Sequence, residues 1–99
     1  MDMVPLIARF YESIADDARI SSTHISVYMA LLHTQNLNGG INPIAVKRDL
    51  IMIKAKILAR QTYNKCMNEL HNYGYILYEP ATNGSVCSRV SLIKQELKQ

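Results

Sequence analysis

The chain has 99 residues, an apolar fraction of 48% and a formal net charge of +3. This length allows one domain with one modest hydrophobic core, and it excludes a two-domain enzyme. No apolar run approaches the ~20 residues of a membrane span, and Cys66 and Cys87 lie outside any CxxC or metal-ligand spacing. We therefore expect a reduced, cytoplasmic protein whose cysteines act as small buried apolar residues.

The basic residues are concentrated in one segment of the chain. Residues 47–65 carry six Lys or Arg side chains against Asp49 alone, whereas residues 1–46 carry two against four Asp or Glu. Residues 66–99 carry three side chains of each sign. Because the position of charge says more about a polyanionic partner than its sum, residues 47–65 are the candidate for contact with nucleic acid.

Helical spacing of apolar residues predicts two helices before residue 40. The first covers residues 3–18, with Asp2 available as an N-cap. The second runs from an N-cap among residues 21–23 to about Asn38, where Gly39 and Gly40 end it. It is apolar on more than one side, so we expect it to be the central buried helix. The apolar residues that recur at spacings of three and four in the first helix are Ile7, Phe10, Tyr11, Ile14 and Ala18.

The next segment predicts a short edge strand followed by two helices. Residues 41–46 are extended and contain Pro43, which confines them to a sheet edge. Residues 47–55 form a short helix whose inward side chains should be Leu50, Ile51 and Ile53. Residues 56–57 turn the chain, and a longer helix runs from about residue 59 to residue 73, where Gly74 stops it.

The end of the chain predicts a β-hairpin. Residues 75–78 and 86–92 alternate as strands, and residues 80–85 connect them with Asn83-Gly84, a dipeptide typical of tight hairpin turns. Residues 94–99 form a polar tail. We therefore expect a mainly α protein with a small hairpin, in the order helix, helix, strand, helix, helix, strand, hairpin loop, strand.

The helix over residues 59–73 separates into an apolar and a polar side. A helical wheel places Tyr63, Cys66, Met67, Leu70 and Tyr73 together, facing the central helix. The opposite side is an arc of roughly 140° that lacks a carboxylate, with Glu69 at its margin. Arg, Asn and Gln carry the paired donors and acceptors that match base edges in the DNA major groove. This arc consists of Arg60, Gln61, Asn64, Lys65, Asn68, His71 and Asn72.

Several short segments together resemble a known family. They are RDLIM at 48–52, KI at 56–57, TYNKCM at 62–67, EL at 69–70 and GYI at 74–76, preceded by STHISVY at 22–28. Over about residues 20–93 the chain resembles winged helix-turn-helix proteins, both short stand-alone bacterial transcriptional regulators and the winged-helix domains of plasmid replication initiators. The resemblance implies one domain over residues 1–99: an accessory helix at 1–19, the winged helix-turn-helix at 20–93 and the tail at 94–99.

By this resemblance the helix from Ala59 is a recognition helix, and residues 79–88 are the wing. We expect base contacts from Arg60, Gln61, Asn64 and Asn68, and phosphate contacts from Lys47, Arg48, Lys54, Lys56 and Lys65. The wing residues would be Asn83, Gly84, Ser85 and Arg89; with little charge at its tip, an ordinary hairpin is an equal alternative. The family commonly opens this helix with Ser or Thr, whereas here Leu58-Ala59 provides no side-chain N-cap, at a cost of about 1 kcal/mol.

No catalytic or metal site is predicted. His24, His33 and His71 have no Cys or carboxylate at a ligand or triad spacing, and Gly39-Gly40 belongs to no phosphate-binding loop. His24 and His33 are predicted to pack or to cap, and His71 to be solvated or to contact phosphate. We expect no enzyme activity, no cofactor and no small-molecule effector.

The sequence thus favours a small bacterial regulator that binds double-stranded DNA. Phe10, Tyr11 and Ile14 of the first helix are candidates for a homodimer contact, with extra cover of the core as the alternative role. Two other hypotheses remain: a winged-helix module that binds another protein, and a DNA-binding accessory of plasmid replication or mobile-element excision.

Overall fold

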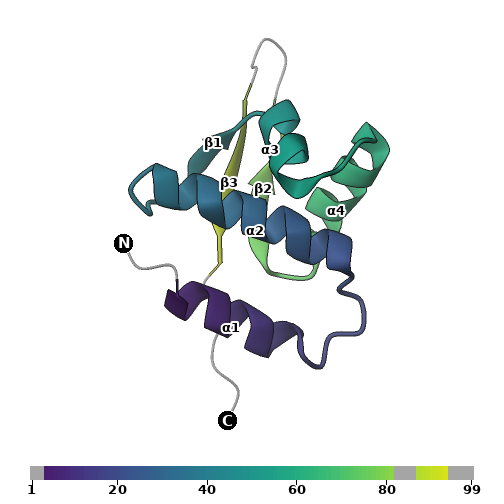
Figure 1. Ribbon diagram of the computed structural model, residues 1–99. Helices are drawn as coiled ribbons and strands as arrows, with labels where there is room; N and C mark the ends of the chain where they lie inside the picture. Colours follow the sequence, from purple (N-terminus) through teal and green to yellow (C-terminus); the bar gives the residue numbers. More distant parts are fainter. Residues whose placement is uncertain (1–3, 82–86, 94–99) are drawn as a thin grey trace.

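The computed structural model describes residues 4–81 and 87–93. Within them the chain forms four helices and a three-stranded antiparallel sheet in the order α1, α2, β1, α3, α4, β2, β3 (Figure 1). The predicted α+β class and the predicted order of helices and strands are confirmed; Asn83, Gly84, Ser85 and the tail lie outside the described residues. The helices are Val4–Ile14, Ser22–Leu37, Arg48–Ala55 and Arg60–Asn72, and the strands are Ile44–Val46, Ile76–Glu79 and Ser88–Leu92.

Helix α2 is the central element, as its all-round apolar sequence predicts. Ser21 caps it: the Ser21 Oγ accepts from the His24 backbone N–H, and the His24 Nδ1 accepts from the Ser21 backbone N–H at 2.9 Å. This reciprocal pair satisfies two donors that would otherwise be unpaired at the helix start. His24 therefore caps the helix as predicted. His33 lies in the last third of the helix and is exposed, so it is not the packing residue that the sequence predicts. The helix ends at Leu37 with Asn38 as its C-cap, and Gly39 and Gly40 follow with positive φ.

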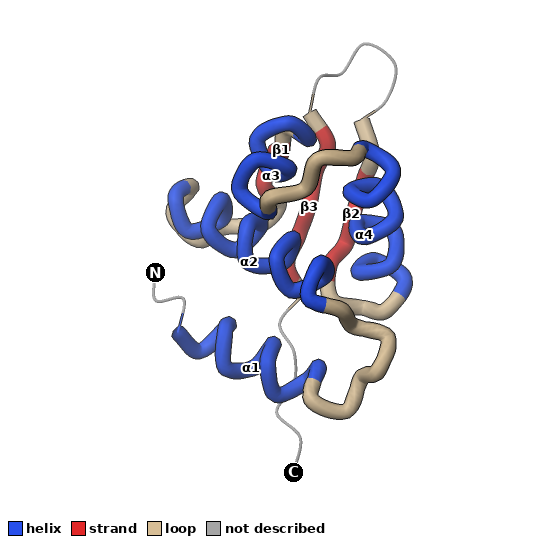
Figure 2. Tube along the Cα trace, turned by 45° about the vertical axis from the view of Figure 1, so that its right-hand side comes forward, coloured by secondary structure: helices blue, strands red, loops and turns tan. Residues whose placement is uncertain are grey.

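Helix α1 lies on the side of α2 that faces away from α3 and α4 (Figure 2). The Phe10 ring is fully buried and stacks on Tyr28, with ring centroids 3.8 Å apart. It also makes a T-shaped contact with the Tyr75 ring, with centroids 5.6 Å apart. Ile14 is half-buried against the same core, and Tyr11 is 47% exposed. Phe10 and Ile14 thus provide core cover, the alternative role considered for this helix, whereas Tyr11 remains exposed.

The chain leaves α1 earlier than the sequence predicts. The helix ends at Ile14, and Ala18 is exposed in the following loop. The Asp17 carboxylate accepts two hydrogen bonds from the Arg19 guanidinium, both at 2.8 Å, and one from the Tyr75 hydroxyl at 2.7 Å. These contacts stabilise a loop where local spacing alone favours one more helical turn. Local spacing could not predict this loop, because Tyr75 lies 58 residues away in sequence.

The sheet covers the other side of the core. Strand β3 lies in the middle, antiparallel to β1 and β2, with Val90 opposite both Ile44 and Tyr78. The alternation of buried and exposed residues along β1 and β3 follows the two-residue period of a strand with one buried face. The Asn42 side chain continues the ladder beyond β1, since its amide donates to the Leu92 carbonyl and accepts from the Leu92 N–H.

The inward face of α3 differs from the prediction. Ile51 is buried as expected, but Leu50 is 54% and Ile53 is 66% exposed, and Met52 and Ala55 face the core instead. Four consecutive apolar residues cover the full circumference of a helix, so two of them must point outward. The contact with α2 decides which two, and the local sequence does not.

Replacing Asp17 with Asn should lower the melting temperature near neutral pH. The Arg19 guanidinium and the Tyr75 hydroxyl hold the pKa of the Asp17 carboxyl well below its usual range. Because this pKa is lower in the folded chain than in the unfolded chain, ionised Asp17 adds stability above about pH 4, and that stability is lost as the pH falls further. The gap in melting temperature between wild type and Asp17→Asn should be constant from about pH 5 to 7 and shrink toward pH 2.

Thermal melts followed by circular dichroism measure this gap. Glu12→Gln, which removes an exposed carboxylate on α1, is the control for the change in net charge. A gap that persists unchanged at low pH would contradict the assigned role of Asp17.

Candidate nucleic-acid interface

The polar side of α4 is exposed over its whole length. Each residue assigned to the polar arc lies on the solvent side, including the four predicted base-contact residues Arg60, Gln61, Asn64 and Asn68. The opposite side is buried in the core through Tyr63, Cys66, Met67 and Leu70. Tyr73, also predicted to face inward, is half-buried beneath the Arg19 guanidinium, which lies 4.1 Å from the ring centroid. The division of α4 into a packed and a free side is confirmed.

Glu69, the carboxylate of α4, is held away from this polar side. Its Oε1 lies 2.9 Å from the His24 Nε2 on α2, and its Oε2 accepts from the Tyr73 hydroxyl at 3.3 Å. The hydrogen bond from His24 lowers the pKa of Glu69, so the carboxylate stays ionised while tied to α2. The exposed surface of α4 therefore presents cations and amides without a competing negative charge. Glu69 and His24 are 45 residues apart, and no local pattern could have paired them.

The starts of α3 and α4 are both without a side-chain cap. Lys47 precedes α3 and Ala59 precedes α4, each with extended backbone angles and no hydrogen bond from its side chain to the first turn. The uncapped junction that the sequence indicates at Leu58-Ala59 is thus confirmed. Free backbone N–H groups at a helix start can donate hydrogen bonds to an anion, a favourable arrangement beside a phosphate backbone.

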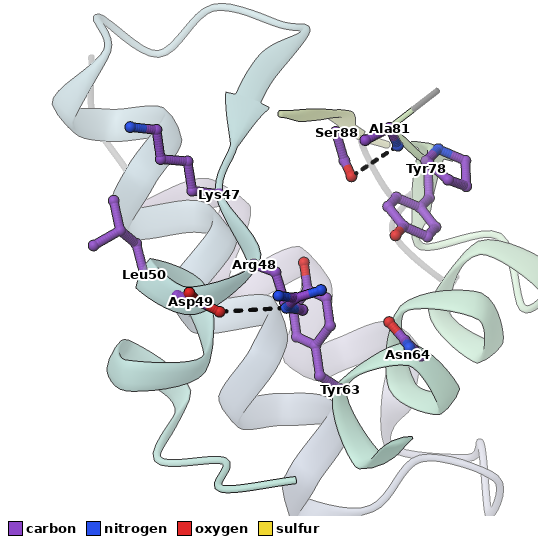
Figure 3. Close-up of a pocket in the computed structure, with 10 residues that line it drawn as sticks. Lys47, Arg48, Asp49, Leu50, Tyr63, Asn64, Tyr78, Ala81 and Ser88 are labelled. Atoms are coloured by element: carbon purple, nitrogen blue, oxygen red, sulfur yellow. Dashed lines mark hydrogen bonds and ion pairs between the residues drawn. The ribbon is translucent and has the colours of Figure 1, made fainter. Parts of the chain in front are cut away.

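A cleft of about 730 Å³ joins α3, α4 and the ends of β2 and β3 (Figure 3). Lys47 and Arg48 line it from the start of α3, and Asn64 lines it from α4. Two residues predicted to bind phosphate therefore share one surface with a residue predicted to read bases. Arg48 also lies 3.3 Å from the Asp49 carboxylate, which leaves Lys47 as the cation of this cleft without an ion pair among the described residues. The cleft is completed by Asp49, Leu50, Tyr63, Tyr78, Pro80, Ala81 and Ser88.

Tyr63 and Tyr78 line this cleft, and the sequence predicted neither of them as a surface residue. Burial raises the pKa of Tyr63 to about 12, with Arg48 close enough to oppose that rise. Tyr63 therefore remains a neutral phenol at physiological pH. The spacing of Tyr63 within α4 correctly indicated a core residue. Its side chain is long enough to cross the core and reach the cleft, which a helical wheel cannot show.

The remaining predicted phosphate contacts occupy different places. Lys65 is exposed on α4, whereas the Lys54 ammonium donates to the Thr34 hydroxyl on α2 at 2.9 Å. Lys56 is exposed in the turn between α3 and α4 with a left-handed backbone, φ 62°. It lines a second cleft, of about 560 Å³, between the start of α2 and the α3–α4 turn. The five cations thus surround α3 and α4 and do not form one cluster.

The predicted wing is described only at its base. Arg89 is exposed on β3, opposite Ala45 on one neighbouring strand and Glu79 on the other. His71, at the end of α4, is exposed, and its Nδ1 accepts from the Tyr78 backbone N–H at 3.0 Å, which ties α4 to β2. This bond gives His71 a structural role that the polar arc did not indicate.

The other side chains considered for chemistry are packed or dispersed. Cys66 is buried, which raises the pKa of its thiol, and Cys87 is half-buried. Within residues 4–81 and 87–93, no cluster of three His, Cys, Asp or Glu side chains could hold a metal ion. Of the helices in the described part of the chain, none has the length and apolar character needed to cross a bilayer.

Comparison with known proteins does not assign the chain to a family. It matches no protein-family model, no curated protein and no solved structure.

Substitutions on the two sides of α4 should separate stability from binding. Leu70 is fully buried, so Leu70→Ala should destabilise the protein by ~2–5 kcal/mol as a core truncation. Asn68 is exposed on the same helix, and Asn68→Ala should leave the free energy of unfolding nearly unchanged. Urea denaturation measures both; equal losses would show that the two faces of α4 are wrongly assigned.

Adding a hydroxyl at the start of α4 should stabilise the fold. Ala59 has the extended N-cap backbone, φ −105° and ψ 130°, that lets a Ser side chain accept from the first helical turn. Ala59→Ser should therefore raise the free energy of unfolding by ~1 kcal/mol. Ala8→Ser, on the exposed side of α1, is the control without a cap position. No gain at position 59 relative to this control would contradict the assigned helix boundary.

Proposed function

We propose that this protein binds double-stranded DNA as a small bacterial transcriptional regulator of the winged helix-turn-helix type, with α4 in the major groove. The observation that carries the proposal is the exposed side of α4, which presents Arg60, Gln61, Asn64 and Asn68 and no carboxylate. Arg pairs with guanine edges, and Asn or Gln pairs with adenine edges. A helix that is only solvated usually alternates acidic and basic residues, which α4 does not.

The cleft beside α4 supports the same proposal. Lys47, at the uncapped start of α3, and Asn64, on α4, line one surface. A DNA backbone that passes this cleft would meet the Lys47 ammonium and the free N–H groups of α3 while the neighbouring bases face α4. Neutralising three to six phosphates in this way would make the affinity fall steeply as salt rises.

A second copy of the chain would extend the contact. One module reads few base pairs, so useful specificity calls for a dimer on a two-fold symmetric site. Because Phe10 is fully buried, a dimer through α1 would use the exposed Tyr11 and Val4, seven residues apart on one side of the helix.

A protein-binding module is the competing function, favoured by one specific observation. Leu50 and Ile53 are exposed together on the outer side of α3, and exposed apolar side chains of this size favour protein contacts. Such a module would use the same fold without binding DNA.

Electrophoretic mobility shift of random duplexes at two salt concentrations tests the proposal. The wild-type protein should bind at low salt, and the slope of log affinity against log salt should become shallower by about 1 to 2 in the variant that combines Arg60→Ala and Lys65→Ala. Arg9→Ala, on α1 at the far side of α2, is the matched control and should leave the slope unchanged. Absence of binding at low salt, or an unchanged slope in the double variant, would refute DNA binding through α4.

A further inference from the structure

Leu58 is an apolar side chain that packs against none of the residues the structure describes. It lies between α3 and α4 and is 99% exposed, whereas the preceding residue, Ile57, is 9% exposed. The left-handed backbone of Lys56 reverses the chain, so that the Ile57 side chain points into the core and the Leu58 side chain points to solvent. Its exposure therefore follows from the geometry of the turn, which positions Leu58 directly before the first turn of α4.

Two further residues with methyl groups lie beside Leu58 at the start of α4. Ala59 and Thr62 are exposed beside it, and all three line the cleft between the α3–α4 turn and the start of α2. Exposed methyl groups here are followed by the polar side chains of Arg60 and Gln61. A ligand that approaches the start of α4 would thus meet an apolar contact first and hydrogen-bonding groups next to it.

We propose that Leu58 contacts the 5-methyl group of thymine in the major groove, an inference that rests on the proposed DNA binding through α4. Residues at the start of a recognition helix are those that contact base edges. The thymine methyl is the apolar group that distinguishes base pairs in this groove, and aliphatic side chains read it. Leu58 then determines a preference for thymine next to the bases that Arg60 and Gln61 contact.

This role explains why the start of α4 has Leu58-Ala59 and no Ser or Thr N-cap. A Ser or Thr at this junction would cap the helix and offer a hydroxyl to phosphate. Leu58-Ala59 provides neither, and both residues are exposed. In the free protein the Leu58 side chain is exposed to water, whereas an apolar contact with DNA would bury it.

The experiment compares thymine with uracil, which differs by the 5-methyl group alone. Random duplexes are enriched on the wild-type protein, and the enriched pool is then amplified once with dTTP and once with dUTP. The wild type should bind the thymine pool about fourfold more tightly, the effect of one buried methyl group. Leu58→Ala should bind both pools equally in mobility-shift titrations and should melt at the wild-type temperature, because Leu58 packs against nothing.

Leu37→Ala, which truncates another exposed leucine at the end of α2, is the matched control and should keep the preference for thymine. Equal binding of the two pools by the wild type would overturn the inference while leaving DNA binding intact. A preference that survives in Leu58→Ala would overturn it as well, because another residue would then read the methyl group. If neither pool binds at low salt, the proposed function fails and the inference fails with it.

Discussion

The packing of α4 on α2 is the constraint on which the rest of this structure depends. Tyr63, Met67 and Leu70 are almost completely buried, and a helix with one buried side must turn its remaining side to solvent. The arc of amides and cations is therefore displayed because of what lies behind it. The same packing places Gly74 where the chain must reverse, with φ 88°, so that β2 can return along the core and pair with β3.

Polar contacts between distant segments refine this arrangement. His24 holds Glu69, Tyr75 holds Asp17, and Asn42 holds the end of β3, each across 45 or more residues. The first contact matters most for the proposed function, because it removes a carboxylate from the margin of the polar arc. The second joins the loop after α1 to Tyr75, whose ring lies against Phe10. The His24–Glu69 contact thus affects the charge of the candidate interface, and the Tyr75–Asp17 contact affects the stability of the fold.

Local pattern and tertiary context contribute differently to α3 and α4. The sides of α4 could be predicted because its apolar residues recur at spacings of three and four among polar ones. In α3 the consecutive apolar residues cover every direction, so the burial of Met52 and the exposure of Ile53 had to be decided by contact with α2. The end of α1 was predicted too late for the same reason: Tyr75, a partner of Asp17, lies 58 residues away, directly before β2.

The candidate interface divides in the same way. Its chemistry, a basic segment followed by an amide-rich helix, could be predicted from the order of residues 47–73 alone. The sequence by itself determined the elements, their order and the polar side of α4, because these depend on spacing within one helix or strand. Only the tertiary structure brought Lys47 and Asn64 into one cleft, turned Glu69 away and exposed Leu58, because each of these depends on how the chain packs against itself.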